Sequence, residues 1–543
     1  MTLAPVARRT ALLLLAAPVA FLATFFFGPL AVVLAAAPPG SAAWEWMGSD
    51  YVRGRVGGAV LQAALSVALT LLVAAPLAWF LHRRRVPWTR AQLAVHAAPF
   101  VLPVFVVVYG VQHALGPRGL SATLLGVDAL AAVGPLGAVV IAHAYYNYGF
   151  AARVLHGTLE RRPVALEEAA RTLGAPPTSA FLRVTLPALW PAFAAVAVLV
   201  FLLTFASFGV VLFLGQGQVS TLETMLYQNL GGAFPREDRA AALGLLQLVV
   251  NVGLFAAYFG LRRRDLSVPL GAAARRAPAR RRDLALAAAF LAVALVPPLA
   301  VFAGAFRVGN EWSLEAWRAV WDASHPRHLA GFDLPAVVAR SLAYAAATVA
   351  LALSFTLLLA YGSRAFPRRA RQVLEGAAAL PLGVSSLLVG LGLLLSFGAG
   401  SAFDLRESAA LVVIAHALLA FPFAARLVLP ALDLRDRRLD EAAATLGARP
   451  LDVVRRVHLP QLRGPLLLAA GLAAAVSLGD FGASLLLARD DTATLAVWIA
   501  RMDAPFDPLR KAQATALAAI LMLLAAMAYL VVERARPRGV AEA

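Results

Sequence analysis

The chain has 543 residues, of which 61% are hydrophobic and 14% charged, whereas about a quarter of the residues are charged in an ordinary soluble domain. The formal net charge is +18, but most basic residues are Arg in short clusters between apolar runs. This placement is typical of loops beside a lipid bilayer and argues against nucleic acid as a partner. The chain has no cysteine, which excludes disulfides and thiolate metal sites.

Apolar runs recur along the chain, and each is long enough to cross about 30 Å of hydrocarbon as a helix. The fold class predicted is therefore an all-α polytopic membrane protein. The first run follows Arg8-Arg9 and is longer than a signal-peptide core, so it is interpreted as an uncleaved first span. The twelve predicted spans are 10–36, 56–81, 92–115, 136–157, 190–214, 239–261, 284–305, 336–361, 372–397, 409–429, 464–487 and 512–532.

The basic clusters set the predicted orientation. Arg83-Arg84-Arg85 and Arg280-Arg281-Arg282 lie in loops on the same side as the N-terminus when the spans are counted in order. Cytoplasmic loops carry an excess of Lys and Arg. We therefore expect this side to be cytoplasmic, and the even number of spans places both termini there.

The chain contains an internal duplication. The segment 139–187 aligns without a gap to 412–460, an offset of 273, with about half of the positions identical. Two repeats in the same orientation are related by an axis along the membrane normal. The predicted division is a first transmembrane repeat at 1–261, a cytoplasmic Arg-rich linker at 262–283 and a second transmembrane repeat at 284–543.

The most specific motif lies between the fourth and fifth spans of each repeat. A Glu-Ala-Ala sequence favours a short helix, a glycine four residues after the last Ala can take the positive φ that ends it, and Leu-Pro opens the next helical stretch. The pattern predicts a helix-turn-helix that projects into the cytoplasm. Its residues are Glu168, Ala169, Ala170 and Gly174 in the first repeat and Glu441, Ala442, Ala443 and Gly447 in the second.

This duplicated motif resembles the EAA loop of binding-protein-dependent ABC importers. The resemblance implies a type I permease-like fold in a bacterial cytoplasmic (inner) membrane, with the motif residues as coupling residues. It also implies two copies of a cytoplasmic ABC ATPase and an extracytoplasmic substrate-binding protein as partners. The chain has no Gly-x-x-x-x-Gly-Lys-Ser/Thr loop. We therefore expect a protein that is not an enzyme and holds no cofactor, with ATP and Mg²⁺ bound to the partner ATPase.

Polar groups inside spans are costly in lipid and are the default candidates for a translocation path. Asp480 could attract a cationic substrate or cap a broken helix, and its counterpart in the first repeat is Ser207. His143 and His416 are also equivalent, and helix-to-helix hydrogen bonds are favoured over metal binding for them. An aromatic and amide cluster in the first repeat suits a heterocycle or an interfacial belt. The path candidates are Asp480, Ser207, Tyr145, Asn147, His143 and His416, and no metal site is predicted.

At a finer level the chain resembles the thiamine and thiamine pyrophosphate permeases. The resemblance is carried by residues 205–212 with Thr221-Leu222-Glu223, and by 477–482 with Asp490-Asp491. It implies thiamine or thiamine pyrophosphate as the substrate. Ferric-iron permeases share the fused form and the EAA loops and are the main alternative. An ATP-independent secondary transporter is less favoured, because it does not need two ATPase-docking loops.

Overall fold

The helices follow the apolar runs of the sequence. The computed structural model describes residues 8–161, 165–231, 234–266, 277–398, 401, 403–504 and 506–535. Within these residues, nine helices are long and apolar enough to cross a membrane, and the number rises to twelve when each of three bent pairs counts as one span. The prediction of an all-α polytopic membrane protein is confirmed.

Two predicted spans are sharply bent. The spans predicted at 92–115 and 372–397 are pairs of helices that bend by 105° and 101°. Each bend follows a short 3₁₀ turn with proline in its first two residues, η2 (Ala98–Val101) or η4 (Leu380–Gly383). Proline donates no backbone hydrogen bond, and such turns often end an α-helix.

Two further predictions of continuous spans are wrong. In the predicted span 190–214, α11 ends at Phe205 and α12 begins at Gly209. In the predicted span 464–487, α23 ends at Gly479 and α24 begins at Gly482. The short helices α12 (Gly209–Leu214) and α24 (Gly482–Leu487) pack on α6 (Val104–Leu115) and α19 (Ser386–Phe397), respectively. Hydropathy misses these breaks because apolar residues continue on both sides.

The structure divides into two compact units. The first-repeat unit holds residues 42–311, and the second-repeat unit holds the described residues of 1–41 and 312–538. The first-repeat unit contains α3 (Ala42–Met47), α4 (Asp50–Arg83), β1 (Arg84–Arg85), α5 (Thr89–Ala97), η2, α6 (Val104–Leu115), α7 (Leu120–Leu125), α8 (Ala129–Arg161), α9 (Ala165–Thr172), α10 (Pro177–Ala180), η3 (Phe181–Thr185), α11 (Leu186–Phe205), α12 (Gly209–Leu214), α13 (Leu222–Leu230), α14 (Glu237–Leu266), β2 (Ala277–Pro278), α15 (Arg281–Gly304) and β3 (Arg307–Val308).

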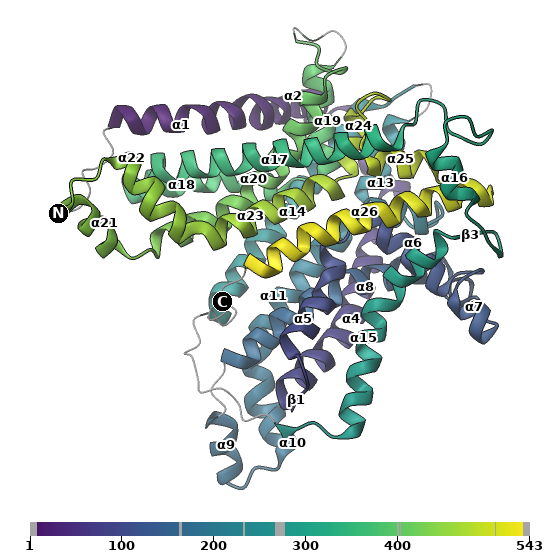
Figure 1. Ribbon diagram of the computed structural model, residues 1–543, viewed down its shortest axis with the longest axis horizontal. Helices are drawn as coiled ribbons and strands as arrows, with labels where there is room; N and C mark the ends of the chain where they lie inside the picture. The colour runs from purple at the N-terminus through teal and green to yellow at the C-terminus, as the bar shows by residue number, and fades with distance from the viewer. Residues whose placement is uncertain are drawn as a thin grey trace. The chain divides into compact units, whose positions relative to one another are not determined.

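In the first-repeat unit, α4 packs along α8 and α11, α11 packs on α14, and α15 packs on α6. In the second-repeat unit, α17 packs along α20 and α23, and α23 packs on α26, as Figure 1 shows. The second-repeat unit contains α1 (Arg8–Leu22), η1 (Ala23–Phe27), α2 (Gly28–Ala36), α16 (Glu315–Trp321), α17 (Leu334–Ser363), α18 (Arg368–Ala379), η4, α19 (Ser386–Phe397), α20 (Ala409–Asp433), α21 (Arg437–Thr445), α22 (Pro450–Val453), η5 (Val454–His458), α23 (Leu459–Gly479), α24 (Gly482–Leu487), α25 (Leu495–Met502) and α26 (Pro508–Ala535). Strand β4 (Glu311–Trp312) lies where the two units meet along the chain.

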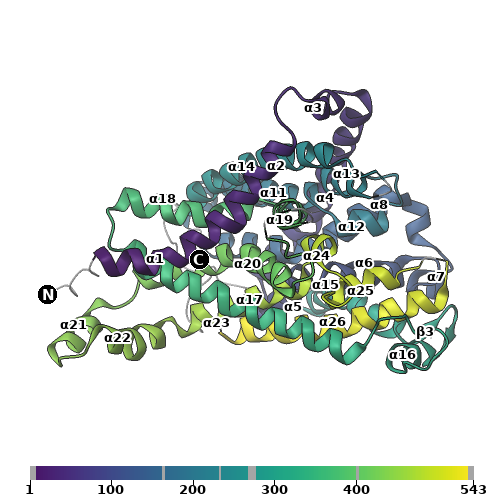
Figure 2. The same ribbon diagram turned by 90° about the horizontal axis from the view of Figure 1, so that it is seen from above.

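The compact units do not follow the repeat boundaries at 261 and 284. The first span of the chain packs against helices of the second repeat, α1 on α17 and α2 on α19 (Figure 2), while α15, which opens the second repeat, packs on α6 of the first. Both contacts are close: a Cβ on Gly110 of α6 would lie 2.9 Å from Pro297 Cβ, and one on Gly392 of α19 would lie 3.1 Å from Pro29 Cβ. Residues 267–276 of the predicted linker lie outside the described residues.

The duplication is visible in the elements themselves. Shifted by 273 residues, α10 falls on α22, η3 on η5 and α12 on α24, each with the same first and last positions. Both η3 and η5 are π-helical turns. The repeats therefore share local backbone geometry through the loop and into the fifth span.

Candidate functional site

The first Glu-Ala-Ala motif forms a helix, a turn and a second helix. Glu168, Ala169 and Ala170 lie in α9, and Gly174 has a φ of +89°. The backbone N–H of Ala175 donates to the carbonyl of Ala170 at 3.0 Å, closing the turn in the manner of a Schellman cap. The expected positive φ at Gly174 is therefore present.

The second motif repeats this geometry. Glu441, Ala442 and Ala443 lie in α21, and Gly447 has a φ of +74°. The N–H of Ala448 donates to the carbonyl of Ala443 at 3.0 Å. The two loops thus share a turn geometry as well as a sequence spacing.

Each loop presents an exposed face with an apolar residue at its tip. Glu168 and Glu441 are exposed. Leu173 is 89% exposed and its equivalent Leu446 is 86% exposed. Sequence reasoning did not select these leucines, although both lie in an identical Thr-Leu-Gly-Ala sequence, at 172–175 and at 445–448. An exposed leucine therefore stands at the same place in both repeats.

A carboxylate just before each motif glutamate holds the loop to the rest of its unit. Glu167 accepts hydrogen bonds from the Arg83 guanidinium at 2.8 and 3.0 Å and from the Thr185 hydroxyl at 3.0 Å. Burial raises the pKa of Glu167, but the hydrogen bonds from Arg83 and Thr185 prevail and leave it below its ordinary value. The carboxylate is therefore charged at neutral pH.

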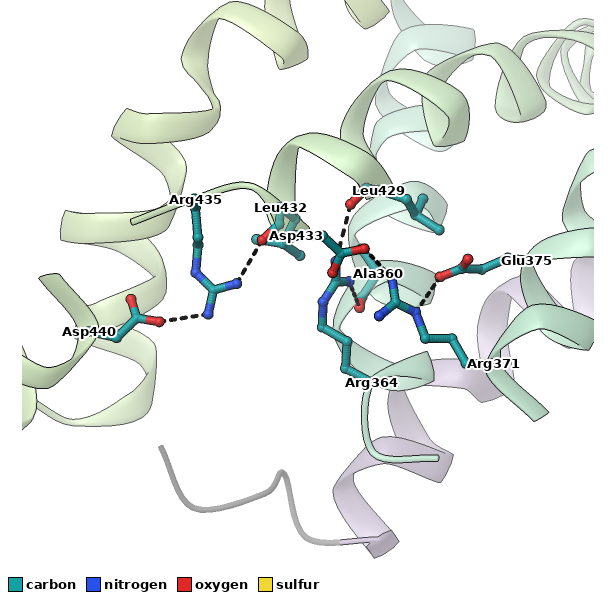
Figure 3. Close-up of polar contacts among 9 residues, drawn as sticks. All are labelled: Ala360, Arg364, Arg371, Glu375, Leu429, Leu432, Asp433, Arg435 and Asp440. Atoms are coloured by element: carbon teal, nitrogen blue, oxygen red, sulfur yellow. Dashed lines mark hydrogen bonds and ion pairs between the residues drawn. The ribbon is translucent and has the colours of Figure 1, made fainter. Parts of the chain in front are cut away.

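In the second loop Asp440 takes this position. Its carboxylate accepts from Arg435 at 2.6 Å, and Arg435 also donates to the carbonyl of Leu432 at the end of α20 at 2.8 Å (Figure 3). The His458 ring lies 2.9 Å from the other carboxylate oxygen. Sequence reasoning did not select Glu167 or Asp440; the signal was an acidic residue directly before the motif glutamate in both repeats.

A second set of ion pairs joins the ends of three helices beside this loop. Asp433, the last residue of α20, pairs with Arg364 after α17 at 2.6 Å and with Arg371 of α18. Arg371 also donates to Glu375 at 2.7 Å (Figure 3). The end of α20, which leads into the second loop, is therefore held to α17 and α18.

The path candidates of the first repeat contact one another in part. His143 lies on α8, with Nδ1 3.2 Å from the Ser66 hydroxyl and Nε2 2.8 Å from the Ser207 hydroxyl. Asn147 donates to the His143 carbonyl at 2.8 Å, whereas the Tyr145 hydroxyl donates to the carbonyl of Ala294 on α15 at 3.0 Å. Ser207 lies at the break between α11 and α12, so His143 joins that break to α8.

In the second repeat His416 and Asp480 occupy the same region. The His416 ring nitrogens lie 2.9 Å from the Ser477 hydroxyl and 2.8 Å from the Ser484 hydroxyl. Asp480 accepts from the Ser484 backbone N–H at 2.9 Å, which satisfies one N–H group in the first turn of α24, and lies 3.4 Å from His416 Nε2. His143 and His416 thus each contact hydroxyl groups on neighbouring helices, and Asp480 accepts a hydrogen bond from the start of α24. Among the described residues no group of three or more His, Cys, Asp or Glu could hold a metal ion.

The sequence comparisons agree with this architecture. The family described as "Binding-protein-dependent transport system inner membrane component" matches residues 46–264 and 352–538, one segment in each repeat. The chain is 30% identical over 501 residues to the thiamine transport system permease protein ThiP of Escherichia coli (strain K12), covering 88% of each chain. It is 30% identical to ThiP of Salmonella typhimurium over 91% of each chain, and 29% identical to ThiP of Brucella abortus (strain 2308) over 88% of this chain and 86% of that one.

These relatives share the fused length of the chain, and the resemblance to fused two-repeat permeases expected from the duplicated loops is confirmed. The family description covers both halves of the chain as transport components of an inner membrane, in agreement with a multi-pass protein whose relatives are permeases rather than enzymes. The chain therefore belongs to the family of inner membrane components of binding-protein-dependent transport systems.

Proposed function

We propose that this chain is the permease of an ATP-driven importer that carries thiamine or thiamine pyrophosphate, delivered by an extracytoplasmic binding protein. The observation that supports the substrate is the similarity to permeases named for thiamine transport over 88% or more of this chain, on both repeats at once. A match limited to the ATPase-docking region would support the importer class alone. Here the similarity extends over the spans in which a substrate path lies.

The two loops support docking of two copies of a cytoplasmic ATPase. Each loop presents a helix with an exposed glutamate, small alanines and an exposed leucine at the turn. Small side chains allow a partner backbone to approach closely, and a central apolar residue surrounded by polar ones is typical of a protein interface. In this proposal ATP and Mg²⁺ bind to the partner, and the coupling residues are those of the two motifs.

The contacts of the first-repeat unit support a cytoplasmic position for its loop. The Arg83–Glu167 pair places α9 at the end of α4 that carries the cluster Arg83-Arg84-Arg85. Strand β1, which contains Arg84 and Arg85, pairs in parallel with β2, so the segment just before Arg280-Arg281-Arg282 lies at the same end. Because basic clusters favour the cytoplasmic side, this end is assigned to the cytoplasm. The even number of spans expected from the sequence then assigns both termini to the same side.

The path candidates Asp480 and Ser207 lie at the helix breaks of the two fifth spans. A broken span exposes backbone polar groups, which in a membrane is tolerated where the backbone is covered by protein or faces a water-filled path. The proposal therefore assigns the path to these breaks, with His143 and His416 setting their geometry and Asn147 bonded to the His143 carbonyl in the first repeat. Tyr145 stays a path candidate, although its hydroxyl donates to α15.

The test is transport by the purified chain in proteoliposomes with its ATPase and binding protein. We expect uptake of labelled thiamine or thiamine pyrophosphate that requires ATP and the binding protein. Uptake of ferric iron alone would show that the substrate is the metal and not the vitamin, and the assignment to ATP-driven importers would still hold. Uptake driven by an ion gradient without the ATPase would contradict the importer class itself.

A further inference from the structure

The carboxylates before the two motif glutamates occupy equivalent positions, since Glu167 shifted by 273 residues is Asp440. Both are shielded from solvent, with the Glu167 side chain 16% exposed and the Asp440 side chain 7% exposed. Both are held by an arginine and by the residue directly before the Leu-Pro of the fifth span. We call Glu167, Arg83 and Thr185 the first clamp, and Asp440, Arg435, His458 and Tyr361 the second clamp.

The hydrogen bonds of the second clamp assign its protons. An ionised carboxylate only accepts hydrogen bonds, so His458 Nε2 carries the proton that it donates to Asp440 at 2.9 Å. With neutral His458, Nδ1 then accepts from the Tyr361 hydroxyl at 3.0 Å, and the two rings are stacked. Asp440 is thereby connected through His458 to Tyr361 on α17.

The two clamps make the same connections with different residues. In the first, Arg83 is the last residue of α4, the second span of its repeat, and it bonds directly to Glu167. In the second, Tyr361 lies on α17, the second span of the other repeat, and reaches the carboxylate through His458. Thr185 and His458 are the last residues of the π turns that lead into the fifth spans. A π turn inside a helix is uncommon and frequently marks a functional site.

We propose that these clamps are positioning elements that transmit movement of the docking helices to the second and fifth spans of each repeat. The proposal rests on the function assigned above to the loops. Moving α9 or α21 without the spans would separate a largely shielded carboxylate from the arginine that donates to it, and breaking a charge-assisted hydrogen bond in this way is unfavourable. The spans therefore follow the loop. Glu168 and Glu441, one residue later, are exposed and remain free to contact the ATPase.

The experiment measures coupling in the complete complex of permease, ATPase and binding protein in proteoliposomes. Glu167→Gln and Asp440→Asn keep the shape of each side chain and remove its charge. We expect the ATPase to bind with unchanged affinity while the substrate transported per ATP hydrolysed falls about tenfold, the factor expected for loss of one charge-assisted hydrogen bond. Asp404→Asn is the matched control, because Asp404 pairs with Arg406 at 2.6 Å in the exposed loop between α19 and α20.

A double-mutant cycle separates transmission from general damage. Arg83→Gln should lower coupling as Glu167→Gln does, and the two together should lower it no further, since both remove the same contact. Tyr361→Phe removes one hydroxyl and keeps the ring, so it tests the second clamp even if Asp440→Asn fails to fold, and it should also lower transport per ATP.

If both Glu167→Gln and Tyr361→Phe transport as much substrate per ATP hydrolysed as wild type, the proposal that the clamps transmit movement is wrong. The proposal that the loops bind the ATPase would be unaffected by that result. Loss of ATPase binding in proportion to transport would also overturn transmission, because the carboxylates would then only shape the docking surface. Failure of the docking proposal itself has a different signature, namely unchanged ATPase binding in variants of Glu168, Glu441, Gly174 and Gly447.

Discussion

Replacing the turn glycines by alanine tests whether the shape of the loop determines ATPase binding. Gly174 and Gly447 have φ values of +89° and +74°, and a Cβ added at either meets no atom within 4 Å. The substitution therefore introduces no clash, and its effect is confined to backbone strain of about 1–2 kcal/mol for an L-residue in this conformation. Strain of that size changes a two-state population by a factor of about 5–30. We expect each alanine variant to weaken ATPase binding by such a factor.

The assay is binding of the ATPase to the purified permease in nanodiscs, with variants at one loop and at both. Gly174→Asn and Gly447→Asn should bind more tightly than the alanine variants, because asparagine tolerates positive φ. Gly376→Ala is the matched control: Gly376 is an exposed residue of α18 where a Cβ also meets nothing, and its φ is not positive. Alanine variants with wild-type affinity, or asparagine variants as weak as alanine, would refute the link between turn geometry and docking.

Three further changes address the loop tip, its support and the helix break. The double variant Leu173→Asp with Leu446→Asp should weaken ATPase binding about tenfold or more in the same binding assay, since both leucines are nearly fully exposed and central to their loops. Unchanged binding would show that the leucines are not part of the interface. Because the pKa of Glu167 is lowered on folding, its stabilising contribution is present above the ordinary carboxyl pKa and is lost as pH falls through the lowered value. The thermal unfolding temperature of Glu167→Gln should therefore vary less with pH in the acid range than that of wild type. Parallel pH profiles for the two proteins would contradict this. Asp480→Ala should lower the unfolding free energy by about 1–3 kcal/mol, because the Ser484 N–H loses its acceptor. Asp480→Asn retains an acceptor and should lower the unfolding free energy less. Equal shifts in the unfolding temperature of the two variants would contradict the capping role.

The local geometry of the loops could be predicted from sequence because it depends on few residues in fixed order. Glycine is the residue that takes positive φ without strain, and a helix that ends on it needs only the carbonyls of the preceding turn. Gly174 and Gly447 therefore have the same conformation although the helices before them share only part of their sequence. The same offset of 273 relates the fifth spans, where α12 and α24 begin and end at equivalent positions.

The packing partners of the first span of each repeat could not be predicted by the same reasoning, and hydropathy did not locate the breaks in the fifth spans. An apolar run of sufficient length predicts a span, but not the neighbours of that span, because lipid and a protein neighbour accept the same apolar side chains. The packing of α2 on α19 and of α15 on α6 depends on shape, with Pro29 and Pro297 fitting against the glycines Gly392 and Gly110. Shape complementarity of this kind requires knowledge of both surfaces.

The clamps were missed for a further reason, which bears on how the repeats should be compared. Arg83 and Glu167 are 84 residues apart, so no local pattern joins them. The equivalents Thr185 and His458 differ in chemistry, so a search for identical residues passes over them. Both nevertheless bind a carboxylate at the end of a π turn, and both clamps connect the docking helix to the second span of the same repeat. Because the two repeats reach this arrangement with different side chains, the property they share is the connection of loop to spans, and this is the property that coupling requires.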